Sequence, residues 1–77
     1  MRMETDFLDV FYGSGNYTNF GAALFQLIKK ADPENLEKLS RGFPLEVELY
    51  RWWLSQADEP TEDQVVKKVR EIESRRP

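Results

Sequence analysis

The chain has 77 residues, a net charge of −3, and neither cysteine nor histidine. This composition excludes disulfides, the usual Cys/His zinc sites and any Ser-His or Cys-His nucleophile. A single core of this size rarely supplies more than about 3–5 kcal/mol of net stability, so good packing or a partner chain must hold the fold.

Charge is spread evenly along the chain. Residues 1–28, 29–57 and 58–77 carry net charges of −2, 0 and −1, so no basic arm suited to nucleic acid stands out. No apolar run approaches the roughly 20 residues that span a bilayer, and the N-terminus leads into no apolar stretch of the signal type. We expect one helical domain over residues 1–77, located in the cytoplasm, with no membrane partner.

Residues 1–15 form an N-terminal aromatic segment followed by a Gly-rich loop. Over residues 4–12 the sequence favours a short helix that Thr5 or Asp6 caps, with Phe7, Val10 and Phe11 on one face. A strand is the alternative, but its alternation of apolar and polar residues is poor. Gly13 ends the segment, and residues 13–16 have the composition of a loop.

Two helices with clear boundaries are expected next. The first covers residues 19–30, capped by Thr18 or Asn16, with an apolar stripe of Phe20, Leu24, Leu27 and Ile28. The second has Asp32 as its N-cap and Pro33 in the first helical position, and Gly42 closes it.

The remaining residues predict two further helices. One runs from Pro44 to Ser55, and the other starts at Thr61, which forms a capping box with Gln64. Residues 74–77 are expected to fray. The fold class is therefore all-α, a compact bundle of four to five short helices with short connections. Its predicted core consists of Phe20, Leu24, Leu27, Ile28, Leu36, Leu39, Phe43, Leu45, Leu49, Trp52, Val66, Val69 and Ile72.

No residue pattern indicates catalysis. Glu46, between Leu45 and Val47, is the carboxylate nearest to an apolar setting, and a solvated acid in a first helical turn is the simpler interpretation. Residues 13–16 match neither phosphate-binding loop pattern, and the helix that Pro44 opens is too acidic for a recognition helix. We expect no enzyme, no cofactor, no metal and no small-molecule ligand.

Trp52 and Trp53 are the only tryptophans, and they are adjacent. At about 100° per residue, Trp52 shares a side with Leu45 and Leu49, whereas Trp53 lies nearer Tyr50. Roughly three-quarters of the surface of this helix is apolar by the same wheel count, which leaves two explanations. Either the helix is central and the N-terminal aromatic segment covers what the other helices leave open, or one side meets another chain.

The second explanation gives the functional prediction. We expect a small protein–protein interaction or regulatory module of the kind found among short bacterial or phage-encoded proteins, whose partner is another protein or a second copy of the chain in a homodimer. Tyr and Trp, with Arg, dominate interface energetics. The predicted partner-binding residues are Val47, Tyr50, Arg51, Trp53 and Leu54. The alternative is a nucleic-acid-binding accessory protein that uses exposed aromatic residues and the basic side of the last helix, at Lys67, Lys68 and Arg70.

Overall fold

The computed structural model describes residues 3–13 and 19–75, which form five helices and no strand. These are α1 (Met3–Phe11), α2 (Phe20–Lys30), α3 (Pro33–Gly42), α4 (Pro44–Ser55) and α5 (Glu62–Glu73). The prediction of an all-α bundle of four to five short helices is confirmed.

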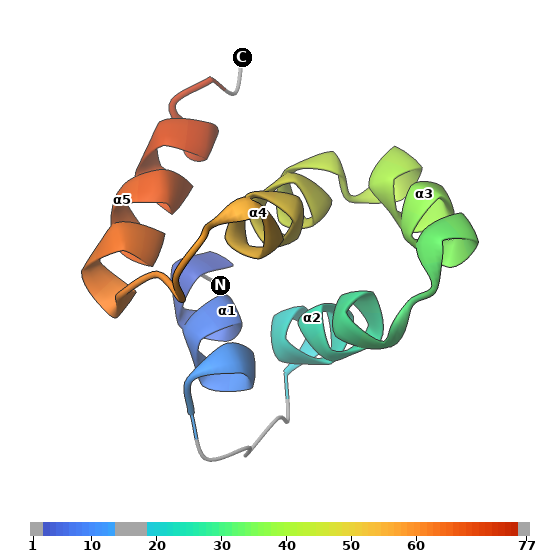
Figure 1. The fold of residues 1–77 in the computed structure, drawn as a ribbon. Coiled ribbons are helices and arrows are strands. Elements are labelled where there is room, and N and C mark those ends of the chain that lie inside the picture. The colour runs from blue at the N-terminus through green and yellow to red at the C-terminus, as the bar shows by residue number, and fades with distance from the viewer. Residues whose placement is uncertain (1–2, 14–18, 76–77) are drawn as a thin grey trace.

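Helix α4 lies in the middle of the bundle (Figure 1). It packs against α2, α3 and α5, and its aromatic side chains also contact α1. Helix α4 is therefore central, as the first explanation has it, but its cover is incomplete, because Leu54 is 55% exposed. The second explanation, in which one side meets another chain, stays a prediction. Because neighbours surround α4, apolar residues occur on most of its circumference.

The predicted starts of α3 and α5 are confirmed, and in both the cap and the amide it binds lie three residues apart. The Asp32 side chain accepts a hydrogen bond from the Asn35 amide at 2.8 Å. Thr61 and Gln64 form the reciprocal capping box. These bonds satisfy amides that the first helical turn leaves without partners.

Two starts differ from the prediction. Asn19 is the N-cap of α2 and accepts a hydrogen bond from the Ala22 amide at 2.8 Å, whereas the predicted caps Asn16 and Thr18 lie outside the described residues. Helix α1 already includes Met3, so Thr5 and Asp6 stand inside it rather than capping it. A Thr or Asp side chain caps a helix only where its own backbone is not yet helical, and the backbone of Thr5 and Asp6 is already part of α1.

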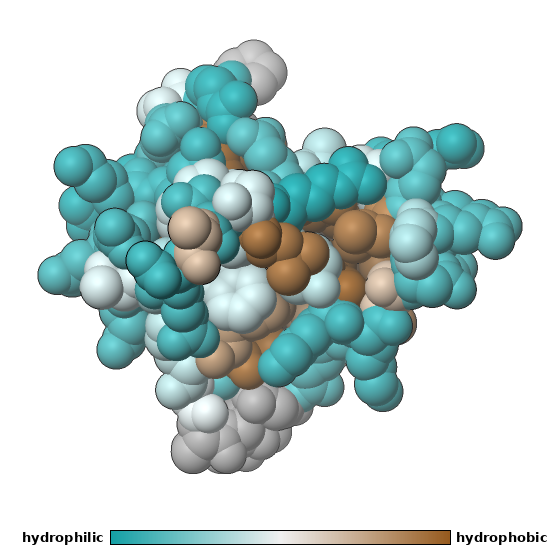
Figure 2. Space-filling model, in the orientation of Figure 1, coloured by the Kyte–Doolittle hydropathy of each residue, from teal (hydrophilic) through white to brown (hydrophobic). Residues whose placement is uncertain are grey.

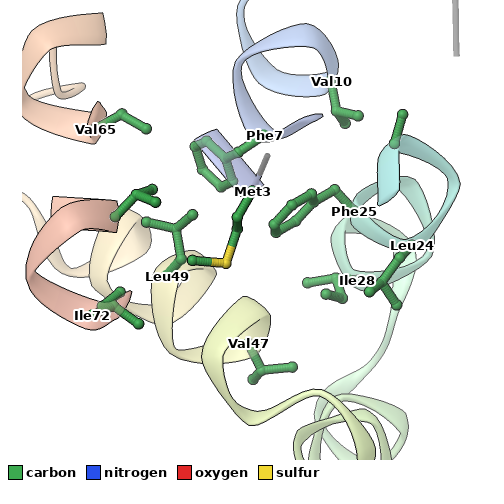
Figure 3. Close-up of a cluster of buried hydrophobic side chains, with 12 residues drawn as sticks. Met3, Phe7, Val10, Leu24, Phe25, Ile28, Val47, Leu49, Val65 and Ile72 are labelled. Carbon is green, nitrogen blue, oxygen red and sulfur yellow. The ribbon is translucent and has the colours of Figure 1, made fainter. Parts of the chain in front are cut away.

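The core is built from four of the five helices, and their buried side chains converge between α1, α2, α4 and α5 (Figure 3). Helix α3 contributes only half-buried residues. The buried hydrophobic residues are Met3, Phe7, Val10, Ala22, Leu24, Phe25, Ile28, Val47, Leu49, Val65, Val69 and Ile72.

Part of the predicted core is wrong. Phe20 and Leu27 are 64% and 52% exposed, and Phe25 is buried instead. The buried side of α2 is rotated by roughly 90° from the predicted stripe, because α1 packs along α2 and draws Phe25 and Ala22 inward. The predicted core also omitted six residues that are buried, namely Met3, Phe7, Val10, Ala22, Val47 and Val65. Six of its members are only half-buried: Leu36, Leu39, Phe43, Leu45, Trp52 and Val66.

Candidate interaction surface

Trp53 is held in place by the N-terminal aromatic segment. Its ring lies edge-on to Phe11 and Phe7, with centroids 4.9 and 6.2 Å away. Its Nε1–H donates a hydrogen bond to the Tyr12 hydroxyl at 3.0 Å. The Tyr12 hydroxyl in turn donates to the carbonyl oxygen of Pro60. Three side chains of one segment thus hold Trp53, yet it remains only half-buried.

Trp52 points toward α5. Its ring is half-buried, and Lys68 Nζ lies 5.9 Å from the ring centroid. Lys68 also forms an ion pair with Glu71 at 3.1 Å, and its side chain is only 19% exposed. The two adjacent tryptophans therefore serve different neighbours, as their separation of about 100° on the helix requires.

The structure separates one predicted partner-binding residue from the other four. Val47 is 1% exposed and belongs to the core, so it offers no surface to a protein partner. Leu54 is 55% exposed, Arg51 is exposed, and Tyr50 and Trp53 are half-buried. We call these last four residues, Tyr50, Arg51, Trp53 and Leu54, the α4 face.

The surroundings of the α4 face are mixed in polarity. Hydrophobic atoms gather over the middle of the molecule, where α4 lies, with hydrophilic atoms around them (Figure 2). Arg51 Nη2 lies 3.7 Å from Glu37 Oε2 of α3. Lys29 Nζ of α2 lies 5.2 Å from the centroid of the Phe11 ring, which itself packs against Tyr50. The α4 face is thus an apolar centre with a charged border, the usual composition of a protein interface.

Sequence reasoning missed the most unusual polar residue. Asp6 is only 2% exposed, and its Oδ2 accepts no hydrogen bond from the residues that the structure describes. A signal for this was present, because Met3, Asp6, Phe7 and Val10 follow the spacing i, i+3, i+4, i+7 of a single helix face. By contrast, Glu46 is half-buried at the start of α4.

Other kinds of site find little support in the described part of the chain. Residues 3–13 and 19–75 contain no group of three or more carboxylates placed to hold a metal ion. None of the helices formed by these residues is long and apolar enough to cross a membrane. No protein-family model, no curated protein and no solved structure matches the chain.

Proposed function

We propose that this protein is a small protein–protein interaction or regulatory module that binds its partner through the α4 face. The supporting observation is the exposure of Leu54, 55%, beside the half-buried rings of Tyr50 and Trp53. An exposed leucine forgoes the free energy of burial, which a partner covering it would restore. Tyr, Trp and Arg side chains carry most of the binding energy in known interfaces.

Rigidity of the aromatic residues favours the same function. Trp53 is already oriented by Phe11 and by its hydrogen bond to Tyr12. A side chain fixed before binding loses little rotamer entropy when a partner covers it, and this lowers the free-energy cost of association. The partner can be a different protein or a second copy of this chain. A cytoplasmic location is part of the proposal, and fractionation of expressing cells would check it.

Leu54→Asp tests the α4 face, and Ser55→Asp is its matched control. Both positions are exposed at the end of α4, so both variants should fold. Light scattering over a wide concentration range measures the solution mass. If the wild-type chain dimerises, Leu54→Asp should shift it to monomer and Ser55→Asp should not. If the wild-type chain is a monomer, the immobilised protein should retain a partner that Leu54→Asp loses.

Equal behaviour of the two variants in both measurements would contradict the proposal. An aspartate at the centre of an apolar contact should weaken it by at least about tenfold, because the carboxylate would be desolvated without a partner. The same charge at Ser55 lies outside the α4 face. The comparison therefore separates an effect of position from an effect of net charge.

Nucleic-acid binding is the second candidate. It is favoured by the half-buried ring of Trp52 beside Lys68, with Lys67 and Arg70 exposed on the same helix. The pairing of Lys68 with Glu71 and the net charge of −3 oppose it. A nucleic-acid binder should be retained on a polyanion column and elute as salt rises. Free passage at low salt would eliminate this candidate.

A further inference from the structure

A groove away from the α4 face runs between the start of α1, the start of α2, the α3–α4 junction and the end of α5. Its volume is about 610 Å³, within the range of roughly 300–1,000 Å³ typical of small-molecule sites. Its apolar lining consists of Met3, Phe20, Leu24, Phe25, Phe43 and Leu45. Two of these lining residues, Met3 and Phe25, belong to the buried core that Figure 3 shows.

Asp6 also lines this groove, and one of its carboxylate oxygens lacks a hydrogen-bond donor among the described residues. The residue is 98% buried by its 2% exposure, and Oδ2 accepts no hydrogen bond from any described residue. A buried carboxylate without a donor costs several kcal/mol. The position of Asp6 in the first turn of α1 offsets part of that cost through the helix dipole, but the dipole donates no hydrogen bond to Oδ2. A ligand with a charged N–H group would donate one.

Three of the four other charged residues in the described lining of the groove are acidic, like Asp6. Glu46, Glu48 and Glu73 line it, and the one basic residue of the described lining, Arg75, is paired with Glu48. An anionic ligand would therefore meet repulsion, whereas a cation gains favourable Coulomb energy on approach. Phe20 is 64% exposed, and the centroid of its ring lies 6.1 Å from that of Phe43. Its ring offers aromatic surface to an apolar or cationic group.

We propose that this groove binds a small organic cation, an ammonium or guanidinium group carried on a short apolar stem. The cation donates its N–H groups to Oδ2 of Asp6, and the stem packs on the more exposed part of the lining, at Phe20, Phe43 and Leu45. This site is independent of the α4 face, so it adds a ligand to the proposed interaction module. It also replaces the expectation, drawn from the sequence, that no small-molecule ligand binds.

Hexylamine is the probe, and hexanol, with the same stem and no charge, is its control. We expect saturable shifts of the backbone amides of Asp6, Leu24 and Leu45 in ¹H–¹⁵N spectra of the full chain. Hydrogen bonds to charged groups contribute enough that hexanol should bind at least about tenfold more weakly. Equal shifts with the two compounds, or no shift at these amides up to about 10 mM hexylamine, would overturn the proposal.

Two variants divide the site into its parts. Asp6→Asn keeps the shape and removes the charge, so the affinity for hexylamine should fall by about tenfold or more while that for hexanol stays the same. Phe20→Ala should weaken both ligands, and Leu27→Ala, exposed on the same helix outside the groove, should weaken neither. Because Phe20 is exposed, its variant stays informative even if Asp6→Asn unfolds.

A blocked Leu-Arg-Leu tripeptide distinguishes a peptide ligand from a small molecule. Hexylamine binding that depends on Asp6 supports the small organic cation. Saturation by the tripeptide at concentrations where hexylamine has no effect would show that the groove takes a basic side chain of a polypeptide, and the proposal of a small-molecule ligand would then be wrong. Unchanged hexylamine affinity in both Asp6→Asn and Phe20→Ala would place the binding elsewhere.

Discussion

The hydroxyl group of Tyr12 joins three parts of the chain. It accepts a hydrogen bond from Trp53 Nε1 in α4 and donates one to the Pro60 carbonyl oxygen between α4 and α5. The residues it links are 41 and 48 positions away in sequence. One side chain at the end of α1 therefore fixes both the orientation of Trp53 and the path of the α4–α5 connection.

Removing this hydroxyl should destabilise the fold and loosen Trp53. Tyr12→Phe leaves the indole N–H and the Pro60 carbonyl without their partner, at a cost of about 1–2 kcal/mol in the free energy of unfolding. Urea unfolding measures the loss, and acrylamide quenching should report a more accessible indole. Tyr50→Phe is the control, because the Tyr50 hydroxyl has no hydrogen bond among the described residues. Equal stability of both variants would show that water replaces the Tyr12 contacts.

Helices α5 and α2 differ in how far their own sequences determine which side of the helix is buried. The start of α5 is closed by Thr61 and Gln64, and its buried residues Val65, Val69 and Ile72 follow one narrow stripe. Nothing in its sequence offers a competing face. Helix α2 has apolar residues on most of its circumference, so its orientation depends on which helix packs against it.

The capping box of α5 should contribute measurably to stability. Thr61 Oγ1 accepts from the Gln64 amide at 3.2 Å, and Gln64 Oε1 accepts from the Thr61 amide at 2.8 Å. Thr61→Ala should lower the free energy of unfolding by about 0.5–2 kcal/mol, and Thr61→Ser should retain most of it. Urea midpoints measure both. A midpoint for Thr61→Ala equal to that of the wild type would mean that packing alone holds the start of α5.

The whole molecule is nearly as deep as it is wide, with principal extents of 30, 29 and 28 Å. Helices of 9 to 12 residues are only about 14–18 Å long, so they cannot form an elongated bundle and instead surround α4. Helices α1 and α5, from opposite ends of the sequence, pack together against it. The core is complete only when both are in place.

Truncation after Asp58 should therefore abolish cooperative folding. The change removes Val65, Val69 and Ile72, each 0% exposed. Burial of each such side chain contributes about 1.5–3 kcal/mol, and their sum exceeds the few kcal/mol of net stability expected at this size. We expect loss of near-UV circular dichroism and binding of a hydrophobic dye. Truncation after Arg75 is the control and should unfold like the full chain. A cooperative transition in the shorter variant would show that α1–α4 fold alone.

Local features of the fold could be predicted from the sequence. The caps at Asp32 and Thr61, the starts at Pro33 and Pro44 and the narrow face of α5 involve residues within about one helical turn of each other, so their physics is contained in short segments. The excess of apolar residues on α4 likewise predicted that several neighbours, including the N-terminal aromatic segment, could surround it. At the candidate surface, Tyr50, Arg51, Trp53 and Leu54 do lie within reach of solvent.

Three features depended on the tertiary structure. Val47 entered the core, Phe20 and Leu27 left it, and Asp6 became buried. Each outcome depends on which helix lies opposite the residue, and a helix with apolar residues on most sides gives no local preference for one rotation over another. By itself the sequence determined where most helices begin and end, because caps and prolines act over a few residues. Packing between distant segments alone decided which side of each helix is buried, and with it the groove at Asp6 and the exposed part of the α4 face.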